Sequence, residues 1–297
     1  MSIIKVEAVS KYYGPVVGVT DLSFSVEEGE IFGFLGPNGA GKTTTIRLLM
    51  QLLYPSQGRI FLFGKPIDRK DNFHREKIGY LPGEFTPYRN MSSLQFLNYM
   101  AKYRSNPPQL REQLLKRFDY TEQNLHQKIK NLSHGNRQKL GIIYAMEHSP
   151  ELIILDEPTL GLDPLMQEAF YEILRELHES GKTIFLSSHN LPEVEKICHR
   201  VGIIREGNIV TVETIENLKK KRPRRLILTL PVQNSSKPPI LPGTQLIEQA
   251  GNKFTYLIDG DIRSVLQELA QISIEDILFP EPDLEDIFLT YYQKNNS

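Results

Sequence analysis

Residues 36–43 have the sequence Gly-Pro-Asn-Gly-Ala-Gly-Lys-Thr, whose residue types and spacing suit a phosphate ligand. Backbone N–H groups that turn inward bind a triphosphate well, and the three glycines permit the positive φ and the close approach that this requires. Lys42 would reach the β- and γ-phosphates, and the hydroxyl group of Thr43 would occupy a coordination position of Mg2+. The segment therefore predicts a nucleoside triphosphate site.

Two carboxylates, Asp156 and Glu157, follow the apolar run of residues 152–155. A carboxylate at the C-terminal tip of a buried strand lies at the edge where α/β sheets bind ligands. Adjacent strand residues point to opposite sides, so the two carboxylates cannot do the same job if the strand persists. One could hold Mg2+ through water, and the other could orient or deprotonate an attacking water.

Three further segments contain residues that could contact a nucleotide. His189 follows the predicted buried strand 183–187, so it lies at the same sheet edge as Asp156, where a γ-phosphate contact would be useful. Ser133 is a suitable N-cap for a helix that runs to about residue 148, and this helix start is either a second anion-binding terminus or a simple capped helix. Tyr13 either stacks on a nucleobase or is a core or turn tyrosine.

The elements around these residues predict an α/β fold. A buried strand at 31–35 leads into the phosphate loop, and a helix over 44–53 leads out of it. Apolar residues alternate over 3–32 in the manner of antiparallel strands, whereas helical spacing prevails over 92–130. The other elements that we expect are strands at 59–63 and 78–82, a helix of about sixteen residues after 163, and a hairpin over 201–210.

Composition restricts the class of protein. The 297 residues suggest one large domain with a smaller one, or two domains, and the net charge of −1 provides no global field for nucleic acid. The single cysteine, Cys198, cannot form an intramolecular disulfide, which fits a reducing compartment and a buried apolar role. We see no signal peptide and no apolar run that approaches 18 residues, so a membrane role would come through a partner.

With these residues in view, the chain resembles an ATP-binding subunit of an ABC (ATP-binding cassette) transporter over roughly residues 4–214. The phosphate loop matches the family's Walker A motif, and the strand ending in Asp156 matches Walker B. The resemblance implies ATP and Mg2+ as cofactors, with Glu157, His189 and Lys42 as catalytic residues. It implies nucleotide contacts from Tyr13, Gly36, Pro37, Asn38, Gly39, Ala40, Gly41, Lys42, Thr43, Thr44, Ser133, Gly135, Asn136 and Asp163.

Two departures from the family pattern concern the signature and the Q-loop. Residues 132–136 read Leu-Ser-His-Gly-Asn where the family has Leu-Ser-Gly-Gly-Gln, but Ser133 and Gly135 remain, so we expect a working signature. The Q-loop glutamine, which touches Mg2+ in the family, aligns with Gly83. Glu84 is the next residue, and we expect it to join Thr43 and Asp156 as a metal ligand in place of the glutamine.

The domain organisation that we expect has three parts. Residues 1–214 form the nucleotide-binding domain, with its helical subdomain at about 84–150. Residues 215–225, six of whose last seven are basic, form a linker that is either a solvated hinge or a phospholipid contact. Residues 226–297 form a small α+β accessory domain with strands at 226–230, 254–258 and 272–277 and a helix at 262–270. The ending 282–292 resembles that of cassette ATPases serving bacterial exporters of drugs, antibiotics, peptides and sodium.

The resemblance implies an ATPase that energises export through a separate membrane-spanning permease, at the cytoplasmic face of the cell membrane. It also implies a two-fold homodimer in which each ATP site is completed in trans, and no nucleic-acid partner. A cassette ATPase without a permease, acting in translation or DNA repair, is the main alternative. Translation-type members usually carry two cassettes, and repair-type members have a long coiled coil where this chain has 89 positions between Thr43 and Leu132. A non-catalytic nucleotide-binding regulator is the third possibility.

Overall fold

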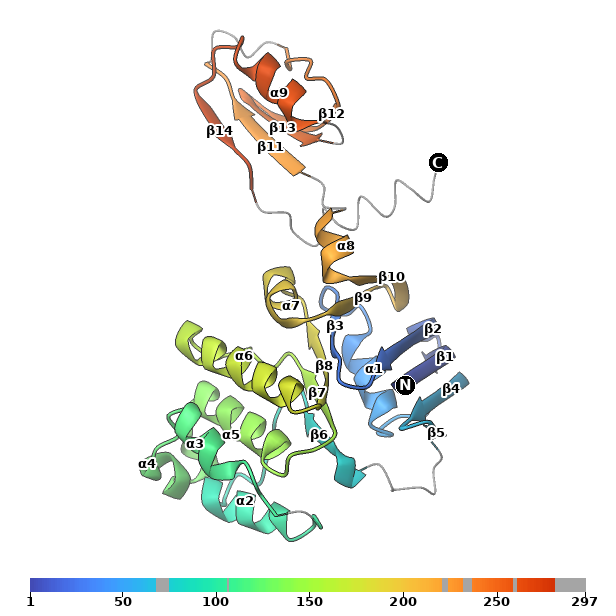
Figure 1. The fold of residues 1–297 in the computed structure, drawn as a ribbon, viewed down its shortest axis with the longest axis vertical. Helices are drawn as coiled ribbons and strands as arrows, with labels where there is room; N and C mark the ends of the chain where they lie inside the picture. The colour runs from blue at the N-terminus through green and yellow to red at the C-terminus, as the bar shows by residue number, and fades with distance from the viewer. Residues whose placement is uncertain (68–74, 106, 221–223, 232–236, 259–260, 281–297) are drawn as a thin grey trace. The chain divides into compact units, whose positions relative to one another are not determined.

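The computed structural model of the protein contains two compact units, Met1–Ile215 and Glu216–Ser297 (Figure 1). Each unit has its own hydrophobic core, and each is described by itself below. The residues that the structure describes are 1–67, 75–105, 107–220, 224–231, 237–258 and 261–280.

The first unit begins with a four-stranded antiparallel sheet, in the order β2-β1-β4-β5. The predicted alternation holds in the second half of β2 and around Val6, which lies opposite Phe24 in the antiparallel register, but it breaks in β1 at Ala8, which is exposed and has a left-handed φ of 48°. These buried side chains form one face of a core that is shared with the second sheet of the unit. The strands are β1 (Ser2–Tyr13), β2 (Val16–Glu27), β4 (Gln57–Leu62) and β5 (Lys65–Pro66).

The second sheet has six strands in the order β10-β9-β3-β8-β7-β6, and all but β10 run parallel. Every residue of the three central strands is buried, which explains why each contains a run of at least three apolar or glycine residues with no charged residue before its last position. Their carboxyl ends meet at one edge, where Asp156 pairs in register with Ser187. The strands are β3 (Ile31–Leu35), β6 (Ile78–Leu81), β7 (Leu152–Asp156), β8 (Thr183–Ser188), β9 (Arg200–Arg205) and β10 (Asn208–Thr214).

Helix α1 (Lys42–Leu49) lies between the two sheets and contributes Ile46, Leu48 and Leu49 to their common core (Figure 1). The expectation that this helix continues to residue 53 was wrong. The chain leaves the helix at Met50, and Gln51 has a left-handed φ of 55°. Met50 and Leu53 have helical spacing in the sequence although they follow the helix, because both side chains pack against the core from the turn after α1.

The remaining helices of the first unit include a group of four that comes from the predicted helical subdomain (Figure 1). The sixteen residues of α6 confirm the predicted length of that helix. The group of four consists of α2 (Ser93–Ala101), α3 (Arg111–Arg117), α4 (Glu122–His126) and α5 (His134–Met146). The others are α6 (Pro164–Glu179) and α7 (Leu191–Ile197), and short 3-10 turns occupy Arg75–Lys77 and Ile129–Asn131.

The second unit packs one helix, α9 (Ile262–Leu269), against an antiparallel sheet of order β12-β13-β11-β14. The expected linker is mostly regular structure, because 215–220 form α8 and β11 begins at Arg224. The strand expected at 272–277 is confined to β14 (Asp276–Leu278), while Ile272 packs against the core before it. The other strands are β11 (Arg224–Thr229), β12 (Thr244–Ala250) and β13 (Lys253–Ile258), and the ending 282–292 lies outside the described residues.

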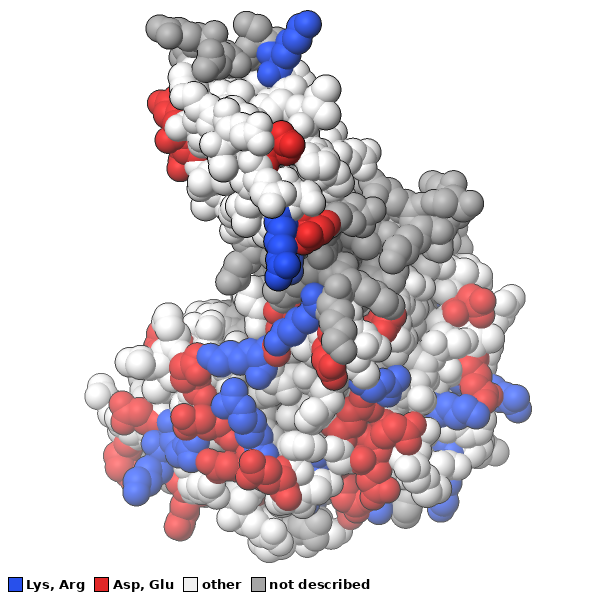
Figure 2. Space-filling model, turned by 45° about the horizontal axis from the view of Figure 1, so that its top comes forward, with Lys and Arg blue, Asp and Glu red and all other residues white. Residues whose placement is uncertain are grey.

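The charges on the first unit are of mixed sign. Figure 2 shows acidic and basic side chains interspersed over the face of this unit that is in view. This agrees with the net charge of −1, since neither sign dominates. Within the described ranges, no helix is both long enough and apolar enough to cross a membrane.

Candidate nucleotide site

The phosphate loop connects β3 to α1, as the sequence predicts, and its backbone is fixed by its neighbours. The N–H group of Gly36 donates to the carbonyl oxygen of Ser188, at 3.2 Å, which ties the loop to the end of β8. A Cβ atom at Gly36 would lie 2.4 Å from the carbonyl oxygen of Ile204, so only glycine fits there. Gly41 has a φ of 108° and precedes the first turn of α1, whose amides are free to face an anion.

Lys42 is buried in this loop, with 6% of its surface exposed. Its ammonium group donates to the carbonyl oxygens of Gly36, at 2.6 Å, and of Pro37, at 3.2 Å. The same nitrogen lies 3.1 Å from Oε1 of Glu157. The charge of Lys42 is therefore held at the mouth of the loop, where the β- and γ-phosphates of a nucleotide would lie.

A cavity of about 330 Å³ extends from the loop to Tyr13. Tyr13 is 41% exposed, which speaks against its reading as a core residue, and the Lys11 ammonium lies 5.5 Å from its ring centroid. An exposed ring at one end of the cavity and cationic and amide groups at the other suit the base and the phosphates of one nucleotide. The cavity is lined by Tyr13, Val16, Val17, Gly18, Pro37, Asn38, Gly39, Gly41, Lys42, Thr43, Thr44 and Glu157.

We expect the substitution Tyr13→Ala to weaken ATP binding about tenfold, because base–aromatic stacking contributes about 1–3 kcal/mol. Tyr13→Phe keeps the ring and should retain the affinity. Titration of the purified chain with a fluorescent ATP analogue measures both variants. The matched control is Tyr12→Ala, because Tyr12 is similarly exposed but does not line the cavity. Equal binding by Tyr13→Ala and the unmodified chain would contradict the stacking role.

The sequence suggested that the side chains of Asp156 and Glu157 point to opposite sides of the sheet, and the structure differs from this expectation. Strand β7 ends at Asp156, and Glu157 has a left-handed φ of 50°, so the alternation of a strand does not apply to the pair. Oδ2 of Asp156 accepts a hydrogen bond from Oγ1 of Thr43, at 2.9 Å, and Oε2 of Glu157 lies 2.8 Å from Nδ1 of His189. Both carboxylates therefore meet the loop, Asp156 at Thr43 and Glu157 at Lys42.

Ser187 is a site residue that sequence reasoning missed. Its hydroxyl group donates to Oδ1 of Asp156, at 2.5 Å, and accepts from the N–H group of Glu157, at 3.1 Å. One buried hydroxyl group thus holds the Asp156 carboxylate and the backbone of Glu157. The signal available in the sequence was a serine directly after the apolar residues 184–186 and two positions before His189.

The signature segment and Asp163 lie outside the cavity. Ser133 caps α5 by accepting from the N–H group of Asn136, at 3.2 Å, and Asp163 caps α6 by accepting from Met166, at 3.0 Å. Within one chain, Ser133 therefore acts as the N-cap of α5, as one of the two interpretations predicted. His134, which replaces a family glycine, packs on Gly161, where a Cβ atom would lie 2.2 Å from Cδ2 of the imidazole.

The structure places Gly83 rather than Glu84 beside the expected metal position. A Cβ atom at Gly83 would lie 3.1 Å from Oδ2 of Asp156, whereas Glu84 is exposed and does not line the nucleotide cavity. The structure thus does not bring Glu84 together with Thr43 and Asp156. Asp156 also acts on Tyr80. Burial is the main reason why the pKa of Tyr80 is raised to about 12, and the negative charge of Asp156 is the second.

A phosphate loop between a buried strand and a helix, with two carboxylates at the same sheet edge, defines a P-loop nucleotide hydrolase. Comparison with known proteins narrows this class. The sequence model described as ABC transporter matches residues 19–160. An ABC transporter ATP-binding protein of Methanocaldococcus jannaschii is 39% identical over 73% of this chain and 80% of its own length. The chain therefore belongs to the ABC transporter family as an ATP-binding subunit, and it is an ATPase.

Two other relatives carry names that refer to export and to resistance. A Nod factor export ATP-binding protein of Paraburkholderia xenovorans is 34% identical over 96% of this chain and 95% of its own. A linearmycin resistance ATP-binding protein of Bacillus subtilis is 34% identical over 72% of this chain and 70% of its own.

The fold is also found among solved structures. A solved structure of an ATP-binding subunit of an ABC transporter is 29% identical in sequence to this chain. Its TM-score is 0.68, and the match covers 74% of this chain and 93% of that chain. A cassette solved as a dimer shares the fold with a TM-score of 0.67, at 23% identity, over 71% of this chain and 98% of that chain.

Proposed function

We propose that the chain energises the export of a substrate through a separate membrane-spanning permease, at the cytoplasmic face of the cell membrane. The main support for export is the similarity to the Nod factor export protein. This similarity extends over 96% of this chain and so includes the second unit. The name of the linearmycin resistance protein supports the same direction of transport.

We further propose how the site hydrolyses ATP. Lys42 holds the β- and γ-phosphates, and the adjacent oxygens of Thr43 and Asp156, 2.9 Å apart, are the hard ligands that suit Mg2+. The ion would offset phosphate charge when bound. Glu157 accepts the proton of the attacking water, and His189 contacts the γ-phosphate. The position of the Glu157 carboxylate, 3.1 Å from Lys42 and 2.8 Å from His189, supports these roles.

The site is completed, in our proposal, by a second copy of the chain. Ser133 is exposed, and neither it nor Gly135, Asn136 or Asp163 lines the nucleotide cavity. The start of α5 is thus available to another molecule, and its free amides would meet the γ-phosphate from the opposite side. The related cassette solved as a dimer supports this arrangement.

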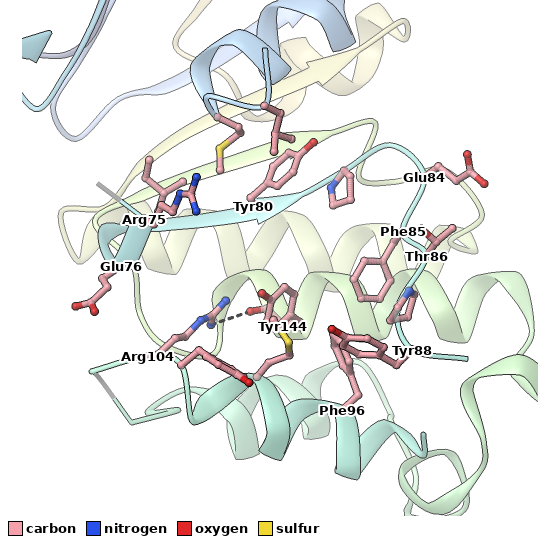
Figure 3. A pocket seen from close by; sticks show the side chains of 17 residues that line it. Arg75, Glu76, Tyr80, Glu84, Phe85, Thr86, Tyr88, Phe96, Arg104 and Tyr144 are labelled. Atoms are coloured by element: carbon pink, nitrogen blue, oxygen red, sulfur yellow. Dashed lines mark hydrogen bonds between the residues drawn. The ribbon is translucent and has the colours of Figure 1, made fainter. Parts of the chain in front are cut away.

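The permease would dock on an aromatic groove of about 920 Å³ in the first unit (Figure 3). Phe96 packs edge-on against Phe85 and Tyr144, with ring centroids 5.8 and 5.3 Å away. Arg104 donates to the carbonyl oxygen of Tyr144, at 3.1 Å, and its guanidinium group lies 4.5 Å from the ring centroid. An apolar floor of rigid rings with charged groups along it suits one amphipathic helix of a partner. Exposed Glu84 belongs to this groove.

The experiment that tests this proposal uses the permease whose reading frame neighbours this one. Tyr88 lines the groove and is 56% exposed, so Tyr88→Glu should leave folding and basal ATP turnover intact. We expect it to reduce membrane association and permease-stimulated turnover about tenfold or more, because a charge would be buried in the interface. Both are measured in vesicles that contain the permease.

The matched control is Ile240→Glu, at a residue that is 95% exposed and distant in sequence from the groove, which should behave like the unmodified chain. Full stimulation of Tyr88→Glu would contradict docking at the groove. If the unmodified chain neither binds these vesicles nor is stimulated by them, the soluble cassette ATPase becomes the better assignment.

A further inference from the structure

We propose that Glu193, a buried carboxyl group on α7, is a positioning residue of the hydrolysis site. It holds the loop that carries His189 and the segment that follows Glu157 in one fixed arrangement. The inference rests on the proposed roles of His189 and Glu157, and it concerns a residue that does not line the nucleotide cavity.

Glu193 fixes the residues on both sides of His189. It is 5% exposed, and its Oε2 atom accepts a hydrogen bond from the hydroxyl group of Ser188. The same hydroxyl accepts from the N–H group of Asn190, at 2.9 Å. The carbonyl oxygen of Ser188 accepts from Gly36, at 3.2 Å. One carboxyl group thus connects the turn around His189 to the first glycine of the phosphate loop.

Glu193 also reaches the segment after Glu157. The side chains of Thr159 and Tyr171 lie close enough to its carboxyl group to interact with it electrostatically. Thr159 stands two positions after Glu157, and its carbonyl oxygen accepts from Leu162, at 3.0 Å. A single side chain therefore lies between the loop that carries His189, the loop that follows Glu157, and α6.

The electrostatic surroundings agree with this placement. Burial raises the pKa of Glu193, and the negative charge of Glu157 raises it further. The hydrogen bond from Ser188 lowers this pKa, and so do the nearby Thr159 hydroxyl group and His189. The carboxyl group is thus within electrostatic reach of both residues that we place at the reacting phosphate.

Packing alone gives no reason for a carboxyl group at this position. A buried carboxyl group is unfavourable unless its partners compensate, and an apolar side chain of similar volume would fill the space at lower cost. All of the polar partners of Glu193 named above belong to, or pack against, segments that carry site residues. Since a misplacement of about 1 Å can reduce turnover about a hundredfold, fixing these segments has direct kinetic value.

The test compares Glu193→Ala with Glu193→Gln in steady-state ATP hydrolysis by the full chain. We expect Glu193→Ala to lower kcat about tenfold or more while KM for ATP changes less than about twofold, because the cavity does not include this residue. Glu193→Gln should recover most of kcat, since its amide oxygen can still accept from Ser188. The matched control is Val194→Ala, a buried neighbour on the same helix, which should lower thermal stability and leave kcat unchanged.

Two more variants make the outcome decisive. Ser188→Ala should reproduce the loss of kcat, and the double variant with Glu193→Ala should lose little more, because both changes remove one interaction. Independent, additive losses would overturn the proposal, and so would a Gln variant as slow as the Ala variant. His189→Ala serves as the reference. If it abolishes turnover while Glu193→Ala does not, this inference fails and the proposed function stands. If His189→Ala retains turnover, the proposed site itself is wrong.

Discussion

Glu157→Gln is expected to reduce ATP turnover by about a hundredfold or more, because it removes the general base while keeping the shape of the side chain. The amide can still hydrogen-bond with His189, whose Nδ1 atom lies 2.8 Å from Oε2 of Glu157. The variant therefore separates proton transfer from positioning. Steady-state phosphate release from the purified chain measures the loss.

The same variant should bind ATP at least as well as the unmodified chain. Oε1 of Glu157 lies 3.1 Å from the Lys42 ammonium group, so the carboxylate competes with phosphate for that charge. An uncharged amide leaves Lys42 to the nucleotide, and unhydrolysed ATP should trap a dimer that size-exclusion chromatography detects. Glu172→Gln is the control, because Glu172 is exposed and pairs with Arg117 on the surface. Undiminished turnover in Glu157→Gln would overturn the assignment of Glu157.

The second large effect is recovery of activity when two inactive variants are mixed. Lys42→Ala should lose ATP affinity about a hundredfold, since charged hydrogen bonds contribute about 1.5–3 kcal/mol. Ser133→Asp keeps a good N-cap for α5 but directs a negative charge at the γ-phosphate of the partner's site. Each variant alone should be nearly inactive.

A mixed dimer of these variants contains one intact site, built from the loop of one chain and the start of α5 of the other. Random association of equal amounts should restore about a quarter of the wild-type sites, because about half of the dimers are mixed and each has one good site of two. Phosphate release by the mixture is compared with that of each variant alone. Ser133→Thr, which keeps both the hydroxyl and the cap, should remain active. A mixture no more active than its components would show that the site lies within one chain.

The phosphate loop and the residues at the strand tips were predictable because their chemistry is local. A glycine-rich turn between a strand and a helix, or a carboxylate at the end of an apolar run, requires few distant contacts to take its shape. Lys42, Asp156 and His189 therefore meet at one sheet edge as expected. The fold class followed in the same way, since the buried runs of the central strands indicate a parallel sheet.

The parts that differed depend on tertiary contacts. The left-handed backbone at Glu157 accompanies the approach of its carboxylate to the loop that Asp156 also contacts, and no residue type at that position signals it. Gly83, rather than Glu84, lies beside Asp156 because the chain turns after β6. Strand β12 escaped notice because most of its residues are exposed and it pairs with β13 through its backbone.

The packing of His134 on Gly161 has a consequence for communication between the two ATP sites of a dimer. In one chain, this contact joins the start of α5, which in the proposed dimer would face the partner's nucleotide, to the loop that follows the chain's own Glu157. Because the imidazole ring of His134 fills the space beside Gly161, a shift of either segment would press on the other. In the proposed dimer, occupancy of one site would therefore act on the loop that follows the proposed catalytic carboxylate of the other, and the two sites would be coupled rather than independent.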